Sequence, residues 1–399
     1  MTDHQVEPAT PGAPPPNFIM VLRQMLAVSD KVSDLIFSPG RAPQVELAGN
    51  LQPVKIPGLE KLTPAHTGGI AKLILGNQEN AIESLEKTGS ADLSFSAPSE
   101  GRFRVNIFKQ RGTHAIVMRV IPARVPRLAE LNLPEQLNQI ADLKNGVVLV
   151  TGPTGSGKSS TLAALIDQIN ETKSYHIVTI EDPIEFLHQH KKSTVHQREL
   201  HSDTPNFAIA LRAALRQAPK VILVGEMRDR ETIEVALEAA ETGHLVLSTL
   251  HTIDAAKTVD RIIGVFPKSE EQAIRTRIAQ SFRYIISQRL IPRIEGHGRI
   301  AAIEILKSTV RTRDYIEKGE SQGKSLLDAM DQGDQEGMQH FDMVIERLIR
   351  EGVVSLEKAL PYATNPNNLM LQLGDLGSGK KQAPAPPKKA DSMLDLIER

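Results

Sequence analysis

The chain has 399 residues, no cysteine, and 47 basic against 48 acidic residues, for a formal net charge of -1. The lack of cysteine excludes disulfides and thiolate metal sites, and the balanced charge does not favour nucleic acid as the main partner. Because no apolar run has the length of a membrane-spanning helix and no signal-peptide pattern opens the chain, we expect a cytoplasmic protein of two or three domains.

The first part of the chain predicts a compact α+β domain after a disordered lead. Residues 1–16 are rich in proline and nearly free of large apolar side chains, so we expect them to be disordered. Residues 17–121 alternate short apolar runs with turn residues, and Thr63-Pro64 reads as the capped start of a helix. The predicted helices begin at Phe18 and cover 64–75 and 78–87, and the predicted strands cover 33–37, 44–47, a run after Asn50, 91–97, 102–110 and 113–120.

The second part predicts an α/β domain. Three prolines in residues 122–134 indicate an interdomain linker. In residues 135–373 strand-like runs alternate with helical patterns, which favours a parallel sheet covered by helices. The predicted strands are Val147–Val150, His176–Ile180, Val221–Val224, Leu245–Ser248 and Ile300–Ile305, and the predicted C-terminal helices are 269–287, 309–318, 341–351 and 355–361. Residues 374–399 form a predicted disordered tail whose last nine residues keep a small apolar face.

A glycine-rich loop follows the first strand of this domain and precedes a helical pattern. The order of strand, glycine loop and helix is typical of a phosphate-binding loop, in which backbone N–H groups turn toward the β-phosphate of a nucleotide. We expect Lys158 to reach the β- and γ-phosphates of ATP and the Ser159 hydroxyl to bind Mg²⁺. The predicted nucleotide-binding residues are Gly152, Pro153, Thr154, Gly155, Ser156, Gly157, Lys158, Ser159 and Ser160.

Polar residues follow each of the next three predicted strands. The carboxyl ends of parallel strands share one edge of a sheet, so these residues should gather at the phosphate loop. We expect Glu226 to hold Mg²⁺ or its waters, Glu185 to align and deprotonate the attacking water, and His251 to sense the γ-phosphate. The alternatives are carboxylates that cap helices and a histidine satisfied in the core.

Two further groups of residues have less specific patterns. Histidines 188, 190, 196 and 201 cluster near Lys191-Lys192, and their spacing favours a solvated loop over a metal site. Arg102, Arg104 and Arg119 lie on predicted strands and are the candidates for cations supplied to a nucleotide in a neighbouring subunit. The arginines of the predicted helical region are expected at the solvated surface: Arg261, Arg275, Arg277, Arg283, Arg289 and Arg293.

Four stretches together resemble the secretion-superfamily ATPases, and most of all their twitching-motility branch, PilT and PilU. They read GPTGSGKSS, TIEDPIEFLHQHKKSTVHQREL, LRQAPKVILVGEMRDRETI and TGHLVLSTLHTIDAAKTVDRI, and the resemblance spans roughly residues 18–373. It implies a ring-shaped homo-hexamer of subunits with a PAS-like N-terminal domain and a RecA-like ATPase domain. It also implies a peripheral position at the cytoplasmic face of the inner membrane, where such rings drive retraction of the type IV pilus through a platform protein.

The resemblance assigns roles by position. The Walker A motif falls on Gly152–Ser159, the Asp box on Thr179–Gln189 with Glu185 as catalytic glutamate, Walker B on Val221–Glu226 and the His box on Thr242–His251. It further matches Ser33-Asp34-Leu35 to an N-terminal motif, and Arg102 and Arg104 to the arginines offered to a neighbouring nucleotide.

Two stretches depart from the pattern of the retraction motor. Residues 309–317 replace a C-terminal motif tied to retraction, and residues 215–219, LRQAP, are more similar to PilU. These departures leave open an accessory ATPase that assists a paralogous retraction ring with little turnover of its own. The missing cysteines disfavour the assembly branch, which usually carries a four-cysteine zinc site, and a RecA-type nucleic-acid motor is disfavoured by the balanced charge.

Overall fold

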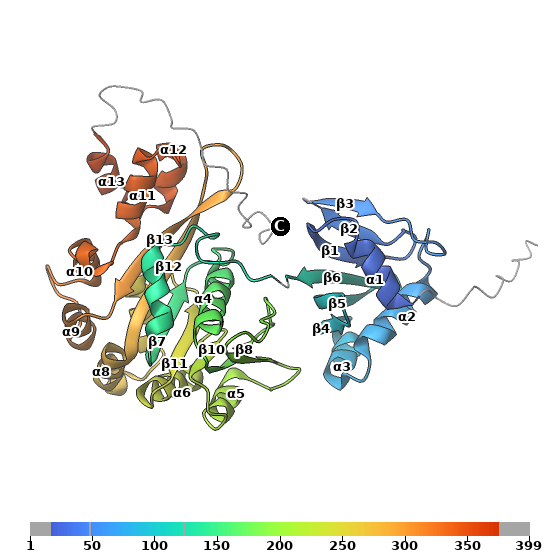
Figure 1. The fold of residues 1–399 in the computed structure, drawn as a ribbon, viewed down its shortest axis with the longest axis horizontal. Helices are drawn as coiled ribbons and strands as arrows, with labels where there is room; N and C mark the ends of the chain where they lie inside the picture. The colour runs from blue at the N-terminus through green and yellow to red at the C-terminus, as the bar shows by residue number, and fades with distance from the viewer. Residues whose placement is uncertain (1–16, 48, 123, 375–399) are drawn as a thin grey trace, which may run out of the picture. The chain divides into compact units, whose positions relative to one another are not determined.

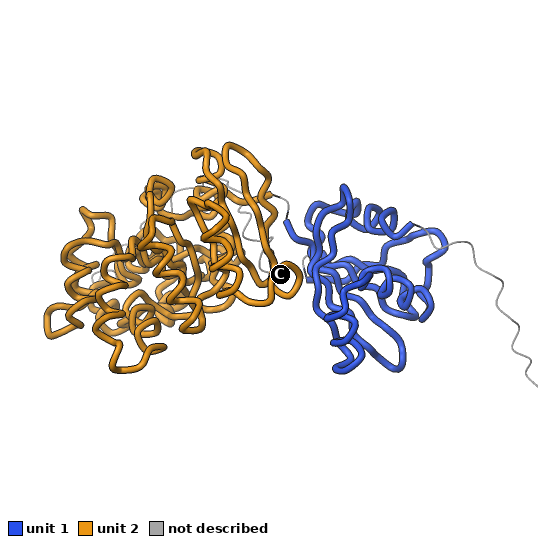
Figure 2. The backbone as a smooth tube through the Cα atoms, turned by 90° about the horizontal axis from the view of Figure 1, so that it is seen from below, with its two compact units in different colours: residues 1–123, 399 blue, residues 124–398 orange. Residues whose placement is uncertain are grey.

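The computed structural model describes residues 17–47, 49–122 and 124–374, so the predicted disordered lead and all but the first residue of the predicted tail lie outside the described residues. The chain divides into two compact units, residues up to 123 and residues from 124 onward (Figure 2). Each unit is described by itself. Within the described residues, no helix is both long and apolar enough to cross a membrane.

The N-terminal unit is a six-stranded antiparallel sheet with three helices, in the strand order β3-β2-β1-β6-β5-β4. Every helix and strand that the sequence predicted here is present. The side chain of Thr63 accepts a hydrogen bond from the amide of His66, so α2 begins at Pro64 as predicted. The elements are α1 (Phe18–Leu26), β1 (Val32–Phe37), β2 (Gln44–Leu47), β3 (Asn50–Pro53), α2 (Pro64–Leu75), α3 (Glu79–Thr88), β4 (Ser90–Ala97), β5 (Gly101–Gln110) and β6 (Thr113–Ile121).

The second unit is built on a seven-stranded mixed sheet in the order β13-β12-β7-β11-β10-β8-β9. All neighbouring strands are parallel except β12 and β13, which form an antiparallel pair. The strands are β7 (Gly146–Thr151), β8 (His176–Glu181), β9 (Thr194–Glu199), β10 (Val221–Val224), β11 (Leu245–Leu250), β12 (Phe282–Pro292) and β13 (Arg299–Lys307).

Helices cover both faces of this sheet (Figure 1). Along β7, Val147 and Leu149 face a core shared with α5 to α8, whereas Val148 and Val150 face a core shared with α4. Both faces are therefore buried, which explains the continuous apolar runs of the central strands. The helices of this layer are α4 (Lys158–Thr172), α5 (Phe207–Ala214), α6 (Arg230–Glu241), α7 (Ala255–Ile263) and α8 (Glu271–Ser281), with a 3₁₀ helix at Glu135–Asp142.

The structure corrects the sequence prediction at three strands. The helix predicted over 269–287 ends at Ser281 and continues as β12, because a strand buried on both faces has the same apolar content as a buried helix. The predicted strand 300–305 is β13, and it runs antiparallel to β12 rather than parallel. Strand β9 was not predicted, because Val195 is the only apolar residue in its sequence TVHQRE, which therefore lacks the usual alternation of apolar and polar side chains.

The C-terminal helices form a third, smaller layer. They include α9 (Val310–Lys318), α11 (Phe341–Arg350) and α12 (Leu356–Ala359), all predicted, and α10 (Leu326–Asp331) and α13 (Pro366–Gln372), which were not. Helices α11 to α13 pack on the ends of β12 and β13 through Ile291 and Ile300. Residues 124–134, assigned to the linker from the sequence, belong to the second unit, where Leu128, Leu131 and Leu133 are buried.

Candidate active site

The glycine loop connects β7 to α4 at the carboxyl edge of the parallel strands. Gly152 has a φ of +143°, and a Cβ at this position would lie 2.5 Å from the backbone carbonyl oxygen of Gln288 on β12. Gly155 has a φ of +76° and no heavy atom within 4 Å of a Cβ. Glycine at 152 is thus required by close contact with the neighbouring strand, and at 155 by backbone conformation alone.

Lys158 lies at the first position of α4 and is buried. Its Nζ donates to the carbonyl oxygens of Gly152 at 3.0 Å and Pro153 at 2.9 Å, so the ammonium is held over the loop. Burial lowers the pKa of Lys158, and the nearby carboxylates of Glu226 and Glu185 oppose this shift. The structure thereby brings together three charged residues that the sequence predicted to converge.

Glu226 lies two residues after the end of β10, and its carboxylate contacts two side chains. Its Oε1 lies 2.5 Å from Nε of Arg228, and its Oε2 lies 3.4 Å from Nε2 of His251. The ion pair with Glu226 raises the pKa of Arg228. Glu226 and His251 therefore lie close together, as the predicted gathering of residues after parallel strands requires. The sequence analysis did not identify Arg228, two residues after Glu226, as part of this group.

Two capped helices limit the freedom of these loops. Asp229 accepts a hydrogen bond from the amide of Thr232 at the start of α6, and Asp254 accepts one from Lys257 at the start of α7. The capping carboxylates are thus Asp229 and Asp254, not Glu226. Because each cap comes three residues after Glu226 or His251, it fixes the chain immediately beyond these two residues.

The loop that carries Glu185 is held by side chains of β9. Gln197 Nε2 donates to Glu181 Oε1 at 3.1 Å and to the Phe186 carbonyl at 2.9 Å, and its Oε1 accepts from the His188 amide at 2.8 Å. Glu199 Oε2 accepts from the amide of Ile184 at 3.1 Å, on the residue before Glu185. Glu185 itself is exposed at this edge. Sequence reasoning missed Gln197 and Glu199, because only the pairing of β8 with β9 brings them to this loop.

Glu181 is the last residue of β8, and its carboxyl has a raised pKa. Burial raises the pKa of its carboxyl to about 7, although hydrogen bonds from Thr179 and Gln197 oppose the shift. The group is therefore partly protonated near neutral pH, beside the loop of Glu185.

The histidine cluster is not a uniform solvated loop. His190 and His196 are exposed, but His196 lies on β9 and its Nδ1 is 2.8 Å from Nε2 of His176. His188 is half-buried, and burial lowers its pKa to about 4. No group of three or more potential ligands that could hold a metal ion occurs in the part of the chain that the structure describes.

The three strand arginines of the N-terminal unit share one face of its sheet. Arg104 pairs in register with Arg119, and Arg102 lies two residues from Arg104 on the same strand. Nε of Arg119 donates to Oδ1 of the buried Asp34 at 3.0 Å. Asp34 therefore orients Arg119, whose side chain is otherwise largely exposed.

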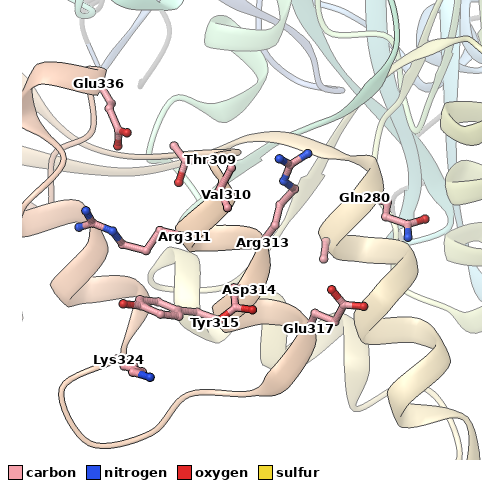
Figure 3. Close-up of a pocket in the computed structure, with 11 residues that line it drawn as sticks. Gln280, Thr309, Val310, Arg311, Arg313, Asp314, Tyr315, Glu317, Lys324 and Glu336 are labelled. Carbon is pink, nitrogen blue, oxygen red and sulfur yellow. The ribbon is translucent and has the colours of Figure 1, made fainter.

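A separate pocket of about 840 Å³ lies beside α9, in the segment that departs from the retraction-motor pattern (Figure 3). Its lining combines Arg311, Arg313 and Lys324 with Asp314, Glu317 and Glu336. None of the predicted nucleotide-binding residues lines it.

Comparisons with known proteins show which family the chain resembles. The family profile "Type II/IV secretion system protein" matches residues 87–357. The type IV pilus retraction ATPase PilT of Pseudomonas aeruginosa is 44% identical over 88% of this chain and all of its own length, and the type IV pilus ATPase PilU of that organism is 39% identical over 88% of this chain and 90% of PilU. A crystal structure of the pilus retraction motor PilT with bound ADP superimposes with a TM-score of 0.78 at 41% identity, covering 88% of this chain and 98% of that one.

We expect Gly152→Ala to abolish ADP binding, because the added Cβ meets a backbone carbonyl that cannot move without distorting β12. Gly155→Ala is the matched control: it incurs only left-handed strain of about 1–2 kcal/mol and should keep measurable binding. Calorimetric titration with ADP and thermal unfolding of both variants check this. An equal loss of binding in both would show that backbone strain, not contact with Gln288, decides the outcome.

The raised pKa of Glu181 predicts a pH-dependent stability. Between its ordinary value of 4.5 and its folded value of about 7, the folded chain holds a proton that the unfolded chain has released. Its stabilising contribution, on the order of 3 kcal/mol, is present at low pH and lost as pH rises through 7. Denaturant unfolding at pH 5 and pH 8 should show a smaller loss of stability in Glu181→Gln than in the wild type. Glu231→Gln, at an exposed carboxyl, should match the wild type; a Glu181→Gln profile that also matches it would contradict the assignment.

Proposed function

The chain belongs to the type II/IV secretion system protein family and is an ATPase of that family, and we propose that it is the motor that retracts type IV pili. The observation that carries the proposal is the meeting of Lys158, Glu226 and Glu185 at the phosphate loop, in a chain 44% identical to a retraction ATPase over nearly its whole length.

In the proposed hydrolysis of ATP, each of these charged side chains has a defined role. Water attacks the γ-phosphorus, the bond to the oxygen bridging the β- and γ-phosphates breaks, and ADP leaves with that electron pair. Glu185 accepts the proton of the attacking water, Lys158 moves from the loop carbonyls to the phosphate oxygens, and His251 donates a hydrogen bond toward the terminal phosphate. The backbone N–H groups of residues 154–160, in the glycine loop and the first turn of α4, bind the phosphates.

The donor set at the carboxyl edge fits Mg²⁺. The carboxylate of Glu226 and the hydroxyl of Ser159 would supply hard oxygen ligands, and a bound Mg²⁺ would help to neutralise the charge on the phosphates. Arg228 contacts only Oε1 of Glu226, so an ion held by that oxygen would compete with Arg228.

We infer that the second unit is RecA-like, that the N-terminal unit is PAS-like, and that six copies assemble into a ring. In such a ring Arg102, Arg104 and Arg119 approach the nucleotide of a neighbouring subunit, where trans arginines stabilise the transition state. Motion of one unit against the other then passes to a platform protein at the pilus base, on the cytoplasmic face of the inner membrane.

An accessory role is the second candidate, and the pocket at α9 favours it. Residues 309–317 supply Arg311, Arg313 and Tyr315 to that pocket in place of the motif tied to retraction. An accessory ring would bind ATP, assist a paralogous retraction ATPase and turn over little by itself.

Steady-state ATP hydrolysis separates the two candidates. The purified full-length wild type should turn over ATP, and Glu185→Gln should reduce kcat by roughly 10²–10⁴-fold while ATP binding survives. Lys158→Ala should lose binding as well, because the phosphates lose their main cation. Glu231→Gln is the control with unchanged turnover. Binding without turnover in the wild type would reject the motor and favour the accessory.

Retraction itself is tested in cells. A strain lacking this chain should lose twitching, and complementation with the wild type but not with Lys158→Ala should restore it, because retraction requires nucleotide turnover. Tracking of single fluorescent pili measures the retraction rate directly. Normal retraction in the deletion strain would contradict the proposed function.

A further inference from the structure

Arg289 connects three segments that are distant in sequence. It lies on β12, two residues beyond Ser287, which pairs in register with Thr151 at the base of the phosphate loop. Its Nη2 donates to the carbonyl oxygen of Ile253 at 3.2 Å, and its Nη1 donates to the carbonyl oxygen of Tyr362 and to Oγ1 of Thr364 at 3.4 Å.

An aromatic ring completes this contact. The guanidinium carbon of Arg289 lies 3.6 Å from the centroid of the Phe341 ring, at the start of α11. A planar guanidinium can stack on a ring and hydrogen-bond at its edges at the same time, which a lysine ammonium cannot do. The C-terminal helices are thus joined to Ile253, two residues after His251.

The other end of the same loop is held by a buried carboxyl. Oε1 of Glu304 on β13 accepts from the amide of Ala255, the first residue of α7, at 2.8 Å. The hydroxyl of Ser287 donates to Glu304, and Thr151 donates to Ser287 at 3.0 Å. Thr151, Ser287, Glu304 and Ala255 are all buried, so water does not compete for these hydrogen bonds.

The loop between β11 and α7 therefore has two anchors. Arg289 holds the carbonyl of Ile253 against the C-terminal helices. Glu304 holds the amide of Ala255 against β13 and is linked through Ser287 on β12 to Thr151 at the base of the phosphate loop. The side chain of His251 is exposed and within 3.4 Å of Glu226, so its position depends on the backbone that follows it.

We propose that Arg289 and Glu304 are positioning residues that set the distance from His251 to the nucleotide and couple that distance to helices α11 to α13. This rests on the proposed role of His251 toward the terminal phosphate of ATP. A terminal phosphate that draws His251 inward pulls on the carbonyl of Ile253, and the guanidinium transmits the displacement to residues 362–364 and to Phe341. The C-terminal helices thereby respond to the presence of the γ-phosphate.

The test uses Arg289→Lys in the full-length protein, with Arg283→Lys as the matched control. Arg283 lies on the same strand, is likewise half-buried and likewise donates to carbonyls, those of Gln280, Ser281 and Phe282, at the opposite end of β12. We expect kcat for ATP to fall by on the order of tenfold to a hundredfold in Arg289→Lys, with ADP affinity within about twofold of the wild type. Arg283→Lys should leave both kcat for ATP and the affinity for ADP unchanged.

Glu304→Gln provides the second variant, since the amide keeps the size of the side chain if Arg289→Lys does not fold. It should show the same fall in kcat with preserved ADP binding. Combining either variant with His251→Ala should cost no more than His251→Ala alone, because the anchors act through His251. Loss of kcat and ADP affinity together, an equal effect in Arg283→Lys, or additive losses in the double variant would overturn the proposal.

Amide hydrogen exchange tests the anchoring by Arg289 independently of the proposed role of His251 in ATP hydrolysis. Exchange in residues 250–255 and 341–345 should accelerate in Arg289→Lys and stay unchanged in Arg283→Lys, whether or not ATP is hydrolysed. If His251→Ala leaves hydrolysis unchanged while the exchange result holds, the role of His251 fails and the anchoring stands. Unchanged exchange in Arg289→Lys refutes the anchoring itself.

Discussion

The parallel alignment of β7, β8, β10 and β11 is the constraint on which the site depends. Their backbone hydrogen bonds fix the register of four strands, so the residues that follow each strand meet at one edge. Both faces of the sheet are buried under helices, which leaves this edge as the place where the loops and their charged side chains meet solvent. The glycine loop lies there because β7 runs through the middle of the sheet.

Opposite charges lie close together at that edge. Lys158 is buried but compensated by Glu226 and Glu185, and Glu226 is itself compensated by Arg228. Removing a charge from water is costly unless a partner remains close, so the opposite charges of these residues stabilise one another. Binding of a nucleotide then exchanges partners within an existing set of charges.

Side chains from the flanking strands hold the loops that carry Glu185 and His251 through hydrogen bonds. On one side β9 supplies Gln197 and Glu199 to the loop of Glu185, and on the other β12 and β13 supply Arg289 and Glu304 to the loop of His251. The two loops with proposed chemistry are therefore each tied to an outer strand. This arrangement connects the centre of the sheet to the C-terminal helices through hydrogen bonds and one stacked guanidinium.

Local sequence was sufficient wherever a signal lies within a few consecutive residues. Thr63-Pro64 marked a helix start, the continuous apolar runs marked buried parallel strands, and Gly152 to Ser159 between a strand and a helix marked the phosphate loop. The meeting of Glu226 and His251 followed from the predicted parallel direction of the strands, because parallel strands end at the same edge of the sheet.

Only the tertiary structure decided what depends on pairing between distant segments. In the tertiary structure, residues 282–292 form a strand rather than the end of a helix, and β13 runs antiparallel to β12. The polar strand β9 pairs with β8. The tertiary structure also placed Gln288 against Gly152 and Arg289 against Ile253, contacts between residues more than thirty positions apart. Periodicity records which side of an element is buried but not which neighbour buries it, and that neighbour is chosen by packing over the whole sheet.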